Sequence, residues 1–260
     1  MKNVEEIIQS IKNTVESGYY ERLAPARREK KSICEYIEKT QDEGTLPIIA
    51  EISTAWPQGG LLFPNRKKAG EMIDKLSTLY DLSAVDVWVE PKYHAGDLRW
   101  LSKKSPIPII AKDWIIDSRQ IVGGDAVILS MPLLNYAGVD FHELIEIAHE
   151  QDLEAVMEIK NAQELGEAKK SEADVILIDN IGPNGSDADI SITISTLLKN
   201  KTGRPVISAN GISSAKDIRS LVVAGVNAIE MSAKQVCNGN FENELDILRK
   251  AIKGKEAGKE

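Results

Sequence analysis

Short apolar segments rich in valine, isoleucine and alanine recur along the chain, and longer segments with helical periodicity separate them. The eight apolar segments span residues 47–52, 84–90, 108–112, 126–130, 155–159, 175–179, 205–209 and 228–231. Their nearly continuous apolar character is typical of parallel strands that helices cover on the outside. Eight successive βα units predict an α/β fold, the closed (β/α)8 TIM barrel.

Six of the intervening segments have clear helical periodicity, and they span residues 66–80, 98–104, 141–150, 162–170, 190–199 and 214–224. The last has the best-marked ends, because Ser213 or Ser214 can cap its start, Asp217 lies in its first turn and Gly225 can stop it. A doubly wound sheet would alternate strands and helices in the same way. It is the weaker alternative, because the sequence has no G-x-G-x-x-G after the first strand and no P-loop.

The length of 260 residues is large for one domain, but barrels of this kind reach it. We therefore expect a single barrel domain over residues 1–260, with the barrel itself at 47–252. Residues 1–46 contain two predicted helices and no predicted strand, so we expect a helical extension that packs over one end of the barrel. The charged residues 253–260 are expected to be a flexible tail.

Composition and charge narrow the classes of partner. The net charge of −8 disfavours nucleic acid and anionic membranes, so we expect a small-molecule substrate. Cys34 and Cys237 form no C-x-x-C pair, and the three histidines lack metal-site spacing, so neither a disulfide, a metal nor an organic cofactor is expected. Without an apolar signal core or a membrane-length apolar run, the protein is expected to be cytoplasmic.

Polar residues follow nearly every predicted strand. In a parallel barrel the active site lies at the C-terminal ends of the strands, and a charge inside an apolar run is costly unless it faces a polar site. In strand order these residues are Glu51 and Ser53, Glu90, Lys112 and Asp113, Ser130, Glu158, Asp179 and Asn180, Asn210, and Ser232. They predict a functional cleft, with Lys112, Glu158 and Glu51 as the strongest catalytic candidates. Asp179 and Asn210 also suit turns.

A lysine among carboxylates supports proton transfer in two ways. The Lys112 ammonium can act as a general acid held by Glu51 or Glu158, while the remaining carboxylate takes up a proton. If burial lowers its pKa, Lys112 can instead form a Schiff base with a carbonyl substrate. Both routes remain open at this point.

Three segments of the chain resemble motifs of the indole-3-glycerol-phosphate synthase family. Residues 46–51, followed by Pro57 and Gly59, resemble the first-strand motif; residues 90–96 resemble an acidic-Lys-Tyr-Phe-x-Gly stretch; and residues 107–116 resemble the third-strand motif with the catalytic lysine. The resemblance extends over most of the chain. It implies a carbon–carbon lyase of tryptophan biosynthesis that decarboxylates and cyclises a carboxyphenylamino-deoxyribulose phosphate.

The resemblance also implies a role for each candidate. Lys112 becomes the general acid, Glu158 the base and Glu51 a supporting carboxylate. Substrate-binding roles fall on Asp179, Asn180, Asn210 and Ser53, and backbone contacts to phosphate fall on Gly211 and Ser232.

Several positions depart from the family motifs. Ser53 stands where the family has a lysine and Ile181 where it has an arginine, and these two cations hold the substrate phosphate in the family. The remaining departures are Trp56 in place of a serine, Ala209 and Asn210 in place of Glu-Ser, and Met231 in place of a glycine.

The departures leave three interpretations open. The chain is a divergent synthase that binds phosphate through its backbone, helped by a lysine such as Lys234; or a paralogue that acts on another, unphosphorylated carbonyl substrate; or a non-catalytic protein that binds a metabolite or partner. Retention of Glu51, Lys112 and Glu158 together speaks against the last of these.

Overall fold

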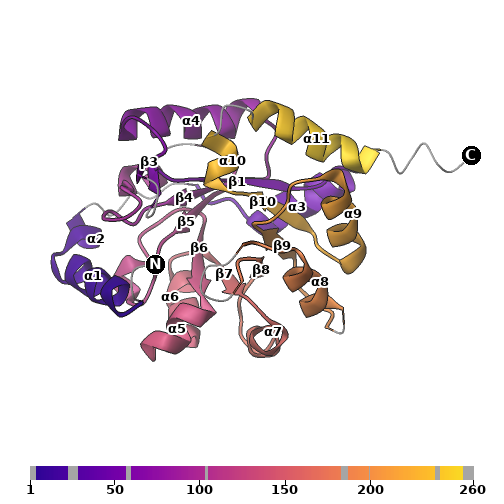
Figure 1. The fold of residues 1–260 in the computed structure, drawn as a ribbon. Helices are drawn as coiled ribbons and strands as arrows, with labels where there is room; N and C mark the ends of the chain where they lie inside the picture. Colours follow the sequence, from indigo (N-terminus) through magenta and orange to yellow (C-terminus); the bar gives the residue numbers. More distant parts are fainter. Residues whose placement is uncertain are drawn as a thin grey trace, which may run out of the picture.

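The computed structural model of the chain describes residues 4–22, 29–56, 60–102, 105–182, 187–198, 200–237 and 241–253. Within this part, eight parallel strands close into a barrel in the order β1, β4, β5, β6, β7, β8, β9 and β10, with β10 hydrogen-bonded to β1. Helices surround these strands (Figure 1). The predicted (β/α)8 barrel is therefore confirmed, and an open doubly wound sheet is excluded.

The barrel strands lie where the apolar segments predicted them, with ends that differ by at most two residues. They are β1 (Ile48–Ile52), β4 (Ala84–Trp88), β5 (Ile109–Lys112), β6 (Ala126–Ser130), β7 (Glu154–Ile159), β8 (Val175–Asp179), β9 (Val206–Ala209) and β10 (Ala228–Met231). A small antiparallel pair, β2 (Ala55–Trp56) and β3 (Gly60–Leu61), was not predicted. Residues 57–59, with Pro57 and Gly59 of the first-strand motif, lie outside the described residues.

The helices are α1 (Val4–Glu16), α2 (Tyr19–Arg22), α3 (Ile33–Asp42), α4 (Arg66–Leu79), α5 (Met131–Ala137), α6 (Phe141–Glu150), α7 (Ala162–Ala168), α8 (Ser191–Leu197), α9 (Ala215–Ala224), α10 (Ala233–Cys237) and α11 (Phe241–Lys253), with 3-10 helices η1 (Leu98–Ser102) and η2 (Ser118–Gln120). Helix α9 begins at a capping box of Ser214 and Asp217 and ends at Gly225 in the left-handed conformation, as predicted. No described helix is long and apolar enough to cross a membrane.

The structure corrects two expectations from the sequence, and other expectations concern residues outside the described part of the chain. The region before β1 contains three described helices rather than two, because the short α2 follows α1 after Gly18. Lys253, predicted as the first residue of the tail, is instead the last residue of α11. Residues 103, 104 and 199, which the pattern placed in helices, and residues 254–260, which it placed in the tail, lie outside the described part of the chain.

The barrel interior has an apolar layer at its N-terminal end. Alternate strand residues such as Ile49, Ile110 and Val156 point inward there and are fully buried. Ile33 and Ile37 of α3 pack against this layer and close that end of the barrel. The described N-terminal region therefore contains a plug for the barrel as well as helices outside it.

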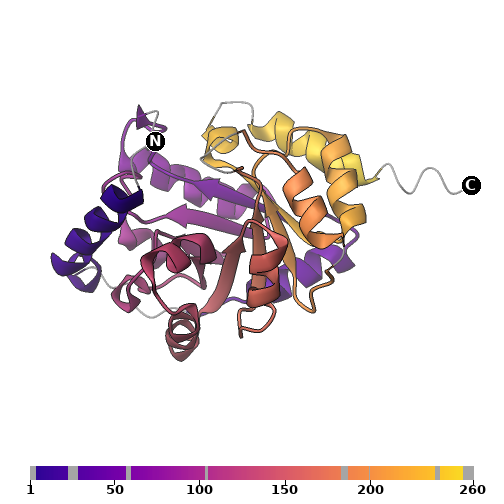
Figure 2. The same cartoon turned by 60° about the horizontal axis from the view of Figure 1, so that its bottom comes forward.

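Helix α3 is fixed to strands that lie far along the sequence. Glu154, the first residue of β7, accepts hydrogen bonds from Ser32 Oγ at 2.6 Å and from the Ile33 N–H at 2.5 Å. Helix α1 lies elsewhere: Figures 1 and 2 show α1 and α3 on different sides of the barrel. Helices α1 and α3 thus pack against different regions of the fold.

Candidate active site

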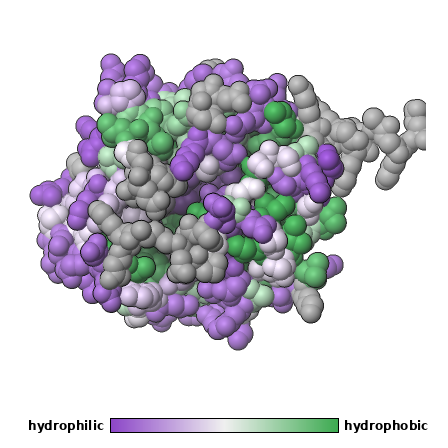
Figure 3. Space-filling view, viewed as in Figure 1, coloured by the Kyte–Doolittle hydropathy of each residue, from purple (hydrophilic) through white to green (hydrophobic). Residues whose placement is uncertain are grey.

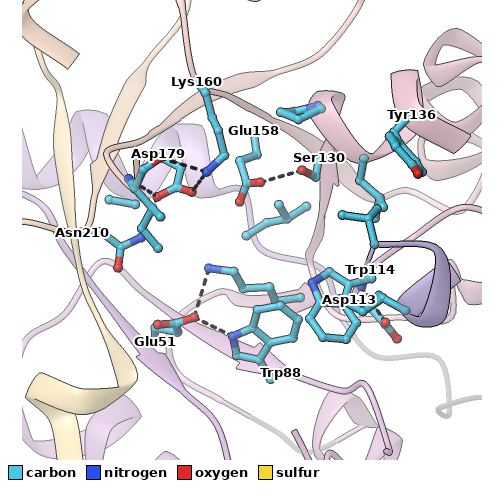
Figure 4. A pocket seen from close by; sticks show the side chains of 18 residues that line it. Glu51, Trp88, Asp113, Trp114, Ser130, Tyr136, Glu158, Lys160, Asp179 and Asn210 are labelled. Atoms are coloured by element: carbon cyan, nitrogen blue, oxygen red, sulfur yellow. Dashed lines mark hydrogen bonds and ion pairs between the residues drawn. The ribbon is translucent and has the colours of Figure 1, made fainter. Parts of the chain in front are cut away.

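Two residues beyond the apolar layer, the same inward face of the strands becomes polar. Because side chains two apart on a strand share a face, the strands place there Glu51, Asp86, Lys112, Glu158, Asp179 and Glu230. Above these residues lies a cavity of about 440 Å³ at the C-terminal ends of the strands. Hydrophobic and hydrophilic residues are interspersed on the surface seen in Figure 3, and Figure 4 shows the cavity from close by.

The cavity wall combines charged and apolar side chains. The polar residues are Glu51, Lys112, Asp113, Ser130, Glu158, Lys160, Asp179 and Asn210, and the apolar residues are Val4, Ile7, Trp88, Trp114, Ile128, Pro132, Leu133, Tyr136, Ile181 and Ala209. Of the predicted site residues, the structure therefore brings Lys112, Glu158, Glu51, Asp179 and Asn210 together around one cavity. Val4 and Ile7 show that α1 also contributes to its wall.

Lys112 is 7% exposed and lies among three carboxylates. Its Nζ is 3.2 Å from Glu51 Oε1, 3.1 Å from Asp86 Oδ2 and 3.1 Å from Glu230 Oε1. Trp88 completes the enclosure, because its ring centroid lies 5.5 Å from Nζ and its Nε1–H donates to Glu51 Oε1 at 2.5 Å. Glu51 also accepts the Ala233 N–H at 2.9 Å.

This arrangement keeps Lys112 protonated. Burial alone would lower the pKa of the ammonium, but the charges of Asp86, Glu230 and Glu51 raise it well above its usual value. A lysine held as ammonium is a proton donor rather than a nucleophile, which favours the general acid over the Schiff base. Burial likewise acts to raise the pKa of Glu51, yet the Lys112 charge and the hydrogen bonds to Glu51 lower it overall.

The same carboxylates have the spacing of a small metal site, since ligand atoms of Glu51, Asp86 and Glu230 lie within 4.8 Å of one another. Their common centre is already approached by the Lys112 ammonium, at 3.1 to 3.2 Å from each carboxylate. The chain itself therefore places one positive charge at the centre of these three acids.

Glu158 lies across the cavity from Glu51, with Ser130 beside it (Figure 4). Ser130 Oγ donates to Glu158 Oε1 at 2.6 Å, and the two residues are paired between β6 and β7. Burial and the nearby Asp179 charge raise the pKa of Glu158. A carboxylate with a raised pKa at the cavity wall is suited to accept a proton near neutral pH.

Lys160, Asp179 and Asn210 form a third polar group on the cavity wall (Figure 4). Lys160 Nζ donates to Asp179 Oδ2 at 2.6 Å and to the Ile181 carbonyl at 3.1 Å, and Asn210 Nδ2 donates to Asp179 Oδ1 at 2.8 Å. The Lys160 side chain is 33% exposed. Besides Lys112, it is the cation that the described cavity wall offers to an anionic substrate.

Aromatic rings form the wall beside Lys112. The His94 ring stacks on Trp88 with centroids 3.6 Å apart, and Trp114 meets Trp88 edge-on at 5.7 Å. Glu90, predicted as part of the cleft, instead fixes the turn that follows β4, because it accepts the three consecutive backbone N–H groups of residues 92–94. A side chain at Gly96 would come within 2.4 Å of the Val89 backbone, which explains the glycine of this motif.

Four predicted site residues do not line the cavity. Ser53 is fully buried, and its Oγ donates to the Ala55 carbonyl. Asn180 is also fully buried and joins Thr193, Ser208 and the Asn210 carbonyl. Gly211, in the left-handed conformation, packs against the Ala188 backbone. Ser232 Oγ and N–H both donate to Gln235 Oε1 at 3.1 Å.

Four residues of the site were absent from the sequence-based set, namely Asp86, Glu230, Trp88 and Lys160. Asp86 and Glu230 interrupt apolar strands, as Glu51 and Glu158 do, so the cost of a buried charge could have identified them. They were missed because only the ends of the strands were considered.

Asp113, beside Lys112, gives a prediction for stability. Burial raises its pKa from 3.8 to about 7, while the Tyr20 hydroxyl, which donates to it at 2.8 Å, limits the rise. The folded state thus retains a proton that the unfolded state has released, so stability falls as pH rises from about 4 to about 7. Each pKa unit corresponds to about 1.4 kcal/mol. We expect Asp113→Asn to remove this part of the pH dependence in urea unfolding.

The matched variant is Tyr20→Phe, which removes the hydrogen bond to ionised Asp113 and should extend the loss of stability to higher pH. Equal slopes of unfolding free energy against pH in wild type and Asp113→Asn would contradict this account of Asp113.

The chain is similar to known proteins in sequence and, more distantly, in fold. It is 29% identical over 242 residues to the indole-3-glycerol phosphate synthase of Staphylococcus aureus strain Newman, covering 88% of this chain and 90% of that one. It is 28% identical over 256 residues to the enzyme of the same name from Carboxydothermus hydrogenoformans, covering 94% and 95%.

Solved structures share the barrel fold. Thiamine phosphate pyrophosphorylase from Pyrococcus furiosus has a TM-score of 0.55 at 16% identity, covering 80% of this chain and 96% of that one. The N-acetylmannosamine-6-phosphate 2-epimerase from Clostridium perfringens has a TM-score of 0.56 at 14% identity, covering 86% and 99%. The family model described as indole-3-glycerol phosphate synthase matches residues 1–243, and the chain therefore belongs to the indole-3-glycerol phosphate synthase family.

Proposed function

We propose that the chain is a carbon–carbon lyase that closes an indole ring by decarboxylating a carboxyphenylamino-deoxyribulose phosphate. The observation that carries this proposal is the Lys112 ammonium at the cavity wall, held by carboxylates and facing a cavity that Glu158 also lines. Family membership supports the same reaction.

In this reaction the aryl carbon that bears the carboxylate attacks the ketone carbon. Lys112 donates a proton to the ketone oxygen, which becomes a hydroxyl, and loss of CO2 returns the bond electrons to the ring. The hydroxyl then leaves as water after a second protonation. Glu158 removes a proton from the carbon next to the ring nitrogen, and the indole becomes aromatic. Glu51 keeps Lys112 charged and oriented, and Trp88 and Trp114 offer an apolar wall for the aryl ring.

The experiment that tests the proposal is turnover of the purified protein with carboxyphenylamino-deoxyribulose phosphate, with CO2 and indole fluorescence followed together. We expect both products in equal amounts. If the folded protein forms neither, the proposal fails.

The phosphate end of the substrate is where the chain departs from its family. Ser53 and Ile181 are both uncharged, and Ser53 is also fully buried, so neither position provides a cation for the phosphate. We propose that Lys160 attracts the phosphate, that Asp179 and Asn210 contact the sugar hydroxyls, and that backbone donors at Gly211 and Ser232 contribute. Ser232 can take part only if its N–H leaves Gln235. Asn180 supports this end of the site through the hydrogen bond that its Nδ2 donates to the Asn210 carbonyl.

An arginine at position 181 should restore a phosphate contact, because Ile181 lines the cavity next to Lys160. A charge-assisted hydrogen bond contributes about 1.5–3 kcal/mol, so we expect Ile181→Arg to lower the KM of the phosphorylated substrate about 10- to 100-fold. The matched control is Ile181→Met. An equal effect on the phosphorylated and the dephosphorylated substrate would argue against a phosphate contact at this position.

A second candidate function is the same acid–base chemistry on an unphosphorylated carbonyl compound. One observation favours it: the Ser232 and Ala233 N–H groups already donate to Gln235 and Glu51, so these amides are satisfied within the chain. Comparing kcat/KM for the phosphorylated substrate and its dephosphorylated form separates the two. A ratio near one favours this second function, and a large ratio favours the synthase.

A further inference from the structure

The proposed reaction uses two protons at the ketone oxygen, whereas one Lys112 ammonium can donate only one before it becomes a neutral amine. The ketone oxygen leaves as water, so it must receive two protons, one when the ring closes and one when the hydroxyl departs. Glu158 takes up one proton from carbon, which leaves a net uptake of one proton per turnover. Lys112 must therefore be re-protonated between the two donations, in a cavity that the substrate fills.

We propose that Glu230 and Asp86 form a buried proton store from which Lys112 is re-protonated after its first donation. The proposal rests on the proposed function. Neither carboxyl lines the cavity, and both are buried, at 2% and 0% exposure. Lys112 contacts both of them at 3.1 Å and also lines the cavity, so it connects the store to the substrate.

The charges around Lys112 require such a stored proton. Three carboxylates contact one ammonium, so full ionisation would leave two excess negative charges in the barrel interior. Apart from their contacts with Lys112 and with each other, Asp86 and Glu230 accept no hydrogen bond among the described residues, whereas Glu51 accepts two besides its contact with Lys112. Protonation therefore costs the least free energy at Asp86 or Glu230, and Glu51 stays ionised.

The titration of the cluster agrees with this geometry. Burial raises the pKa of Glu230 well above its usual value and that of Asp86 to about 6, while the pKa of Glu51 is lowered. The groups that face Lys112 from the surrounding strands are Glu51 on β1, Asp86 on β4, Glu158 on β7 and Glu230 on β10. Because Asp86 and Glu230 interact closely, they share their protons as a pair.

In this relay two protons pass through Lys112 in succession. An N–H bond of the Lys112 ammonium breaks, and the proton passes to the ketone oxygen. The neutral amine then takes the proton of the Glu230 carboxyl, whose O–H bond breaks to leave a carboxylate stabilised by the new ammonium. Lys112 gives this second proton to the departing hydroxyl. After product release, Glu158 gives up the proton that it took from carbon, and solvent protons that enter through the emptied cavity restore the Lys112 ammonium and, through Lys112, the Glu230 carboxyl.

The proton store is tested by infrared spectroscopy on the full chain without substrate. The spectra subtracted are those of labelled and unlabelled protein, and those of variant and wild type. At about pH 8, Asp86 and Asp113, with pKa values of about 6 and 7, are mostly ionised. We expect a protonated-carboxyl band that shifts when glutamate is labelled with ¹³C at its side-chain carboxyl and is lost in Glu230→Gln, but remains in Asp113→Asn. Absence of this band from the unmodified protein, or its persistence in Glu230→Gln, would overturn the store.

The relay is tested by a single turnover of Glu230→Gln. Glutamine cannot supply a proton, so CO2 release should keep nearly its wild-type rate while indole formation slows about 100-fold and the hydroxyl intermediate accumulates. Equal slowing of both steps would overturn the relay. The ¹³C labelling is done on the wild-type chain, so the proton store can still be tested if Glu230→Gln does not fold. If wild type forms neither product, the proposed function fails, and the infrared result still decides the store.

Discussion

Replacing Lys112 with methionine is expected to lower kcat/KM by about a thousandfold or more and to destabilise the protein in a pH-dependent way. The loss of rate follows because methionine cannot donate the proton to the ketone oxygen, and general acids contribute about 10²–10⁴-fold. The loss of stability follows because Glu51, Asp86 and Glu230 remain buried without their cation. Breaking a buried ion pair costs about 3–5 kcal/mol.

The pH dependence of this variant has a definite sign. Without the ammonium, burial raises the pKa values of the three carboxyls above those of the unfolded chain. The folded state then holds protons that the unfolded state releases, so the variant loses stability as pH rises above about 4. The measurement is urea unfolding of both proteins at about pH 5 and pH 8, alongside turnover. The matched control is Lys170→Met, which removes an exposed lysine beyond α7.

Retained turnover in Lys112→Met would remove this lysine from the chemistry. An unfolding free energy that differs from wild type by the same amount at both pH values would show that the carboxyls around Lys112 do not depend on its charge.

Replacing Glu158 with glutamine should lower kcat/KM about 10²- to 10⁴-fold, because the amide cannot accept the proton that leaves carbon. The base acts in its ionised form, so the wild-type rate should fall as pH drops through the pKa of Glu158. Burial and Asp179 raise this pKa, so the fall should occur above the ordinary range of a glutamate. The residual activity of Glu158→Gln should lack this acid limb, and a profile of kcat/KM against pH measures it.

Ser130→Ala provides the matched variant. The Ser130 hydroxyl donates to Glu158 and favours its ionised form, so its removal should shift the acid limb to higher pH and leave most of the plateau rate. An unchanged acid limb in Glu158→Gln would assign it to another group and count against Glu158 as the base.

The fold was predictable because a barrel repeats one local pattern eight times. Each apolar segment became a strand, and the ends of α9 at Ser214 and Gly225 followed from capping chemistry. The central pair of the site was predictable as well, since Lys112 and Glu158 are charges in apolar runs. Three helices of the barrel were not predicted. Helices α5 and α10 are short, and the period of a helix is hard to recognise over five to seven residues. Helix α11 has 13 residues, so its length does not explain why it was missed.

The remaining site residues depended on geometry that local patterns do not contain. Glu230 reaches Lys112 from a strand 118 residues away, which requires closure of the barrel between β10 and β1. Asn180 follows the inward-facing Asp179, so alternation alone would have placed it outside the cavity. Ser53 would face inward if β1 continued, but the strand ends at Ile52 and the chain turns away.

The plug at the N-terminal end of the barrel has a consequence for how the protein folds during synthesis. Helix α3 leaves the ribosome before any barrel strand, yet its Ile33 N–H bonds to Glu154, 121 residues later. The inner surface against which Ile33 and Ile37 pack also includes Ala228 of β10. The helix must therefore wait, with its two isoleucines uncovered, until nearly the whole barrel has been translated. Contacts of such sequence separation slow folding, and the waiting period is when the nascent chain is most exposed to aggregation.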